Sequence, residues 1–232
     1  MRALVLAAVT VVAPVLIACG DGGAGAPSTT PATAVPATTV PATAVSLDKL
    51  DAMRLTLDDV GSFWKAGEPI NDADIADSVQ VPCNPSLDPA VVQRLRAKTG
   101  VQFEPVDGSY LHVMEFLAAG EPTQLAADVR VLFDAWQSCP TTSTLPDGSS
   151  YRDLGPVAVP ELGDQRLARQ VKGVATPTAD VVWFVRSAMV RVGGVLVEVS
   201  LTEVVSTDAS PKISDAEFAK LVAAAVAHVT PV

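Results

Sequence analysis

The chain has few residues of the types that perform acid–base or nucleophilic chemistry. It has two histidines, His112 and His228. We interpret His112 as a partly buried cross-strand residue, and His228 as a surface residue in the last helical turn, where the helix dipole favours a cation. The sequence contains no nucleophile elbow, H-E-x-x-H motif, P-loop or kinase signature. We therefore expect no enzyme activity, no catalytic residues, no cofactor and no metal site.

Two patterns resemble binding motifs but have the wrong context. The glycines within residues 20–25 fit G-x-G-x-x-G, yet a Pro/Thr-rich tract follows them instead of the helix that a dinucleotide site needs. Asp72, Asp74 and Asp77 lie in an expected polar loop that lacks the glycine and the further ligand of a calcium loop. We interpret these aspartates as solvated loop charges.

A short, mainly apolar segment precedes the first cysteine. Arg2 is followed by an apolar run over residues 3–17, which leads into the letters LIACG around Cys19. The run is too short for a transmembrane helix, which needs about 20 apolar residues. It resembles a bacterial lipoprotein signal with its lipobox. The resemblance implies removal of residues 1–18, lipidation of Cys19, and an anchor at the extracytoplasmic face of the cell membrane.

The region after Cys19 has the composition of a linker. Proline recurs at positions 31, 36 and 41 among Thr, Ala and Val. Such a tract cannot bury a core, and its reach is roughly 30 to 80 Å depending on its stiffness. We expect residues 19–45 to be the lipidated cysteine with its linker, and residues 46–232 to form one folded domain.

The two other cysteines are an even pair if Cys19 carries lipid. Cys83 and Cys139 would then lie in an oxidising compartment, and we expect a disulfide between them. It would close a loop of about 57 residues and stabilise the fold by roughly 4 kcal/mol in the chain-entropy model. Two buried free thiols are the main alternative. A metal site shared with the distant histidines is a weaker one, because no ligand spacing matches.

Capping signals and apolar periodicity predict an α+β domain. Helices are expected over 57–63, from Pro89 to just before Gly100, from Pro122 to just before Pro140, and after the N-cap Ser214; strands are expected over 101–105, 109–117, 150–154, 164–172, 180–192 and 195–203. The segment between Trp64 and Pro82 is expected to be a loop. This order predicts an antiparallel sheet of about five to six strands with helices packed on one face.

The clearest local signal is a hairpin at Gly193-Gly194. Pairing across it places Val192 opposite Val195 and, six positions further along the strand, Arg186 opposite Leu201. That face is almost entirely apolar and should meet the helices. Arg186 is the exception, and we expect it at a sheet end or paired with a carboxylate.

The other face of the hairpin mixes polar and aromatic side chains. Trp183, Ser187, Glu198 and Ser200 lie on it, and we take them as candidate ligand-binding residues in the wall of a shallow cleft. An ordinary solvated sheet face is the alternative interpretation.

The charge balance excludes one class of partner. The net charge is −10, and the sequence has no cluster of Lys and Arg. Nucleic acids would be repelled, and so would anionic lipid headgroups. The membrane contact would therefore be the lipid anchor.

Several short motifs together resemble a known family. They are the opening over residues 57–61, Pro82-Cys83, a helix that ends in Trp136-x-x-Cys139, and Gly163-Asp164 before a strand. This layout resembles actinobacterial, mycobacterial-type cell-envelope lipoproteins with a domain similar to the extracellular sensor domain of PknH-like receptor Ser/Thr kinases. The resemblance covers about residues 50–230. It implies an α+β domain with a cleft for an unknown ligand, although the kinase members usually carry two disulfides where this chain can make one.

The sequence thus favours a lipid-anchored envelope protein with a non-catalytic ligand-binding or sensor-like domain. A carrier of apolar or lipid cargo is the alternative, followed by an adhesion module and an enzyme. The expected partners are the membrane through the anchor, a small-molecule or envelope ligand, and an envelope protein. Nucleic acid is not expected.

Overall fold

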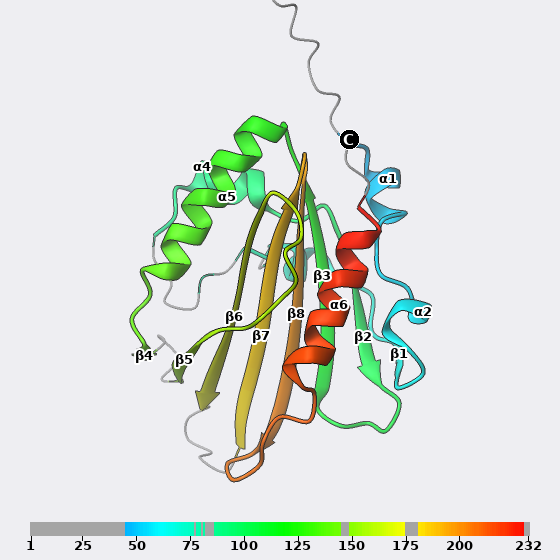
Figure 1. The fold of residues 1–232 in the computed structure, drawn as a ribbon, viewed down its shortest axis with the longest axis vertical. Coiled ribbons are helices and arrows are strands. Elements are labelled where there is room, and N and C mark those ends of the chain that lie inside the picture. The colour runs from blue at the N-terminus through cyan, green and yellow to red at the C-terminus, as the bar shows by residue number, and fades with distance from the viewer. Residues whose placement is uncertain are drawn as a thin grey trace, which may run out of the picture. The chain divides into compact units, whose positions relative to one another are not determined.

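The computed structural model describes residues 45–76, 78–79, 81, 86–144, 149–174 and 181–229. Within these ranges, eight strands form one antiparallel sheet in the order β1-β2-β3-β8-β7-β6-β5-β4 (Figure 1). The strands are β1 (Trp64–Ala66), β2 (Thr99–Pro105), β3 (Leu111–Ala119), β4 (Thr142–Thr144), β5 (Ser150–Pro156), β6 (Gln165–Val174), β7 (Val181–Val192) and β8 (Val195–Ser206).

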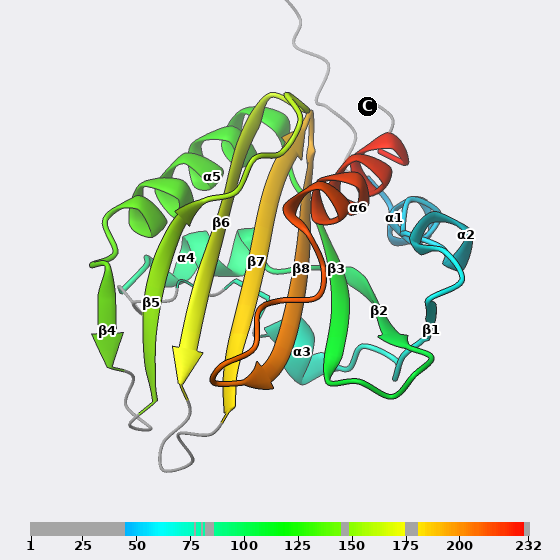
Figure 2. The same ribbon diagram turned by 60° about the horizontal axis from the view of Figure 1, so that its bottom comes forward.

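Helices cover both faces of this sheet. They are α1 (Leu47–Asp51), α2 (Leu57–Val60), α3 (Asp72–Ala76), α4 (Pro89–Leu95), α5 (Pro122–Gln137) and α6 (Asp215–Ala227). Figure 2 shows α6 in front of the sheet, with α3 and α4 behind it. Among the helices that the structure describes, none has both the length and the apolar character needed to cross a bilayer.

The alternation of side chains along β7 and β8 divides the core into two clusters. Val190, Val197 and Val199 pack with Phe218 and Val222 of α6 on one face. On the opposite face, Met189 and Leu196 pack with α4 and α5. Because the side-chain period of a strand is two, a single hairpin supplies both layers.

The predicted hairpin register is confirmed. Val192 pairs with Val195 and Arg186 with Leu201. Gly193 occupies the turn with a φ of 56°, a left-handed conformation that glycine adopts without steric cost. The apolar face of this hairpin meets α6, as its composition predicts.

The α+β class is confirmed, but the sheet differs from the prediction in two respects. It has eight strands in the described residues, because the three-residue strands β1 and β4 extend its two edges. Helices also cover both faces, and not one face. A three-residue strand is too short to show periodicity, and its pairing depends on neighbours that are distant in sequence.

Several helix boundaries also differ. The helix expected over 57–63 ends at Val60, because Gly61 adopts a φ of 86°. Asp88 caps α4 as predicted, but this helix ends at Leu95, and Gly100 belongs to β2. The expected loop from Trp64 to Pro82 contains β1 and α3. Ser214 and Glu217 form the capping box predicted for α6.

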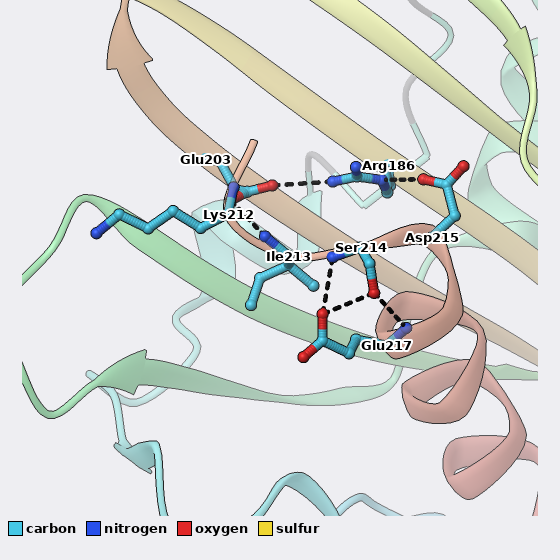
Figure 3. A network of polar contacts seen from close by, with 7 residues as sticks. All are labelled: Arg186, Glu203, Lys212, Ile213, Ser214, Asp215 and Glu217. Carbon is cyan, nitrogen blue, oxygen red and sulfur yellow. Dashed lines mark hydrogen bonds and ion pairs between the residues drawn. The ribbon is translucent and has the colours of Figure 1, made fainter. Parts of the chain in front are cut away.

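A buried ion pair attaches α6 to the sheet (Figure 3). Arg186 Nη1 lies 2.9 Å from Glu203 Oε2, and these side chains are only 5% and 2% exposed. Glu203 Oε1 accepts from the backbone N–H groups of Lys212 and Ile213, at 2.7 and 3.1 Å. Arg186 Nε reaches Asp215 Oδ1 at 2.9 Å. The sequence predicts a carboxylate partner for Arg186, and the structure provides two, Glu203 and Asp215. Together they attach the N-terminal end of α6 to the sheet.

Replacing Arg186 tests the contribution of this pair. We expect Arg186→Met to lower the free energy of unfolding by about 3 kcal/mol or more, because it leaves Glu203 charged, buried and without its cation. Asp215→Asn is the control. Its side chain is 58% exposed, so the expected loss is below about 1 kcal/mol. Denaturant titration of the full chain measures both, and equal losses would contradict this assignment.

Candidate functional site

The four candidate ligand residues lie on one face of the β7–β8 hairpin. Ser187 is directly opposite Ser200, and Glu198 is opposite Met189, one same-face position away. Trp183 lies on the same face, two same-face positions from Ser187 in the opposite direction along β7. Its ring lies directly over Gly173 of β6, so a Cβ on residue 173 would overlap the ring. The sheet therefore brings three of the four residues together, with Trp183 further along.

Much of this face is covered by other parts of the chain. Ser187 and Ser200 are 6% and 7% exposed. A small recess of about 10 Å³ beside Glu198 has Ser78, Leu95 and Leu132 in its lining, which is room for about one water. Burial raises the pKa of Glu198 to about 8, so its carboxyl is mostly neutral at pH 7. Ser187 and Ser200 are therefore packed against other parts of the chain, whereas Trp183 and Glu198 are half-buried.

A larger cleft, of about 280 Å³, lies along the outer edge of β2. β1 pairs with β2 only opposite Phe103–Pro105. Beyond that pairing, the backbone N–H of Gly67 donates to the carbonyl of Gln102 at 2.9 Å, and α1 lies against β2 without pairing with it. The lining residues are Leu47, Asp51, Arg54, Ala66, Gly67, Glu68, Pro69, Ile70, Ile75, Lys98, Thr99, Gly100, Val101 and Gln102. We call this the β2-edge cleft.

Hydrogen bonds hold one wall of the β2-edge cleft in place. Thr99 Oγ1 donates to Asp51 Oδ1. Arg54 Nη1 donates to the carbonyl of Gly100 at 3.1 Å, and its Nε lies 3.6 Å from Asp51 Oδ1. These contacts fasten the C-terminal end of α1 and the turn after it to β2.

The β2-edge cleft presents charges of both signs. Lys98 and Glu68 are exposed in its lining, and the Arg54 and Asp51 side chains are 38% and 40% exposed. Its volume is close to the lower end of small-molecule sites, about 300 Å³. Four charged residues therefore lie in a lining that also includes the apolar residues Leu47, Ile70, Ile75 and Val101.

Sequence reasoning missed this cleft. Its residues come from short segments spread over positions 47–102, and α1 and β1 were not predicted. The one local signal was the three-residue spacing of Asp51 and Arg54, which places opposite charges on one helical face. That spacing is common on solvated helices and does not indicate a cleft.

The cleft wall formed by residues 47–60 rests on a buried acid. We call these residues, which include α1 and α2, the strap. Glu115 of β3 is fully buried beneath it, and its Oε2 accepts from the backbone N–H of Leu55 at 2.7 Å. Its Oε1 has no hydrogen-bond partner in the described part of the chain. Burial raises the pKa of Glu115 from 4.5 to about 7.

A hydrogen bond between Asp59 and His228 joins the strap to α6. His228 Nε2 lies 3.0 Å from Asp59 Oδ1, and the backbone N–H of Thr56 donates to Asp59 Oδ2 at 2.7 Å. Burial acts to raise the pKa of Asp59, but hydrogen bonds from Thr56 and His228 hold it below 3.8. His228 is therefore half-buried at the end of α6, and its interpretation as a surface residue is wrong.

His112 lies where the sequence places it. It is half-buried on β3 and pairs with Thr202 across the sheet. Burial lowers its pKa from 6.5, so the imidazole is neutral at pH 7. The partly buried cross-strand interpretation is confirmed.

The remaining predicted sites are only partly within the described residues. Cys139 follows α5, is half-buried and is disulfide-bonded. Cys83 lies outside the described residues, so the pairing of these two cysteines stays a prediction. Cys19, the glycines of 20–25, and Asp77 also lie outside them. Across the described ranges, no group of three or more His, Cys, Asp or Glu side chains is arranged to hold a metal.

Comparison with solved structures gives a likeness in fold. No protein-family model matches the chain, and no curated protein matches it. Among solved structures, it is similar to the crystal structure of the extracellular domain of PknH from Mycobacterium tuberculosis, with a TM-score of 0.51 and 16% identity over 80% of this chain and 96% of that one. At this identity the likeness shows a shared fold, in agreement with the fold implied by the sequence resemblance.

The buried acid beneath the strap predicts a pH-dependent stability. Because the pKa of Glu115 is raised on folding, its proton stabilises the fold fully below about pH 4.5, and this contribution is lost as the pH rises through about 7. Glu115→Gln removes this dependence. Its stability relative to the natural chain should rise by on the order of 2 kcal/mol between pH 5 and 8.

Denaturant titration of the full chain at several pH values measures this difference. Glu161→Gln is the matched control, because the Glu161 side chain is 90% exposed and should give no such trend. A stability difference between Glu115→Gln and the natural chain that stays constant with pH would show that Glu115 does not titrate in this range.

Proposed function

We propose that the protein is a lipid-anchored cell-envelope protein whose α+β domain binds a small polar ligand without catalysis, as a sensor-like module at the extracytoplasmic face. The observation that carries the ligand-binding part is the β2-edge cleft, with its volume of about 280 Å³ and its charged lining. The placement is supported by the lipobox around Cys19 and by the fold shared with a domain that is extracellular in PknH.

The proposed anchor has three parts in sequence order. Residues 1–18 are the signal peptide, Cys19 carries the lipid, and the rest of residues 19–45 is the linker. Two fatty chains hold a protein stably, at about 0.8 kcal/mol per buried CH₂ group. A disulfide between Cys83 and Cys139 belongs to the same proposal, because an extracytoplasmic location permits it.

The chemistry of the β2-edge cleft favours a polar ligand over apolar cargo. Asp51, Arg54, Glu68 and Lys98 all reach its lining, and a carrier of lipid would have to desolvate these charges on loading. Trp183, Ser187, Glu198 and Ser200 are the second proposed location for the ligand. The packing of their face makes it the less favourable one.

Fatty-acid labelling in the native envelope tests the anchor. The natural chain should take up label and its mature form should begin at Cys19, whereas Cys19→Ala should lose all label because it lacks the acceptor thiol. Cys139→Ala is the control and should keep the label. An unlabelled natural chain, or a mature N-terminus at any other residue, would overturn the proposed anchor.

Native mass spectrometry of the full chain, purified from its own envelope in detergent, tests the binding site. We expect a retained small molecule, bound about tenfold more weakly by Lys98→Ala or Glu68→Ala, because a hydrogen bond to a charged group contributes about 1.5–3 kcal/mol. Ser187→Ala, on the packed sheet face, is the control and should retain it. Loss in Ser187→Ala alone would move the site to that face, and a retained lipid would favour the carrier.

A further inference from the structure

The strap connects the β2-edge cleft to two titratable contacts. On one side, its residues Leu47, Asp51 and Arg54 line the cleft. On the other, Leu55 and Asp59 bond to Glu115 and His228. Figure 1 and Figure 2 both show α1 and α2 beside α6 at the β1–β2 end of the sheet. Any change in the position of the strap therefore changes the wall of the cleft.

The protonation state of Glu115 decides how well the strap is held. Glu115 is fully buried, with one donor on Oε2 and none among the described residues on Oε1. A neutral carboxyl tolerates this environment, whereas a carboxylate there is a buried charge with a single hydrogen bond, which is costly. Lifting the strap exposes the acid to water and removes that cost.

The groups that face Glu115 come from two elements. Arg54 and Asp59 lie on the strap, and His228 ends α6; the first and last of these favour the carboxylate, and Asp59 opposes it. On the same sheet face, the paired neighbours of Glu115 are Val101 of β2 and Val199 of β8, which carry no charge.

We propose that the strap is a proton-controlled wall of the β2-edge cleft, closed while Glu115 is protonated and released when Glu115 ionises. Three buried apolar side chains, Leu50, Met53 and Leu55, attach the strap to the core, so release is a local opening that stays a minority state. The protonation state of Glu115 sets the population of this open state. The consequence for a ligand rests on the proposed function, but the movement itself does not.

Hydrogen exchange of the full chain between pH 5 and 8, corrected for the intrinsic pH dependence of exchange, tests the proposal. A group with a pKa of about 7 when closed and 4.5 when open raises the opening constant by about 70-fold over this range. Strap amides should lose protection by that factor, and they should exchange ahead of the β7–β8 hairpin at every pH. Simultaneous exchange of strap and hairpin would show global unfolding and overturn the proposal.

Two variants assign the response to its residue. Glu115→Gln, a permanent mimic of the neutral acid, should keep the strap equally protected at pH 5 and 8. Glu198→Gln removes a half-buried acid on the opposite sheet face and should leave the pH response of the strap unchanged. The proposal fails if Glu115→Gln responds to pH like the natural chain, or if Glu198→Gln abolishes the response.

A measurement without mutation supports or overturns the same proposal. In the natural full chain, the ¹³C carboxyl resonance of Glu115 and the amide resonance of Leu55 should titrate with one common midpoint near pH 7. A Leu55 amide that does not follow the carboxyl would remove the link between the acid and the strap. Because none of these readouts needs a ligand, their failure is distinguishable from failure to bind one at the cleft.

Discussion

The buried contact between Arg186 and Glu203 sets the geometry on which the rest of this domain depends. Both charges are almost fully buried, so each needs the other, and the carboxylate also takes up the backbone N–H groups of Lys212 and Ile213. This requirement fixes where the chain leaves β8 and begins α6. At its other end α6 places His228 against Asp59. The position of the strap, and with it the wall of the β2-edge cleft, therefore follows from a polar contact at the far end of a helix.

The division of the sheet into two packed faces explains where a ligand has room. The α6 face is filled by apolar side chains, among them Phe103 and Phe218, and by the two buried acids, Glu115 and Glu203. The opposite face is covered by α4 and α5, and the polar residues Ser187 and Ser200 lie within that packing. A sheet covered on both sides leaves its edges as the accessible places. The β2 edge is incompletely paired because β1 is only three residues long, and the cleft forms there.

The strongly patterned parts of the domain were predictable because their signals are local. The Gly193-Gly194 hairpin, the apolar stripe of α5 and the capping box of Ser214 and Glu217 each depend on residues within a few positions of one another. β1, β4, α1 and α3 were missed, since elements of three to five residues are too short for periodicity and are stabilised mainly by distant partners. The sequence correctly places His228 at the end of the last helix. Its partner Asp59 is 169 positions away, and a contact at that separation leaves no trace in a helical pattern.

The amino-acid sequence alone determined the α+β class, the register of the central hairpin, and the faces on which its side chains lie, because the period of two and the turn glycines act over short distances. It also determined that Arg186, on an apolar face, needed either a carboxylate or a sheet end. Only the tertiary structure decided that Glu203 and Asp215 are those carboxylates, that both faces of the sheet are covered, and that the open site lies at β2. These outcomes depend on which distant segments pack together in the interior. There, the free-energy cost of leaving a buried charge unpaired favours one arrangement over the others.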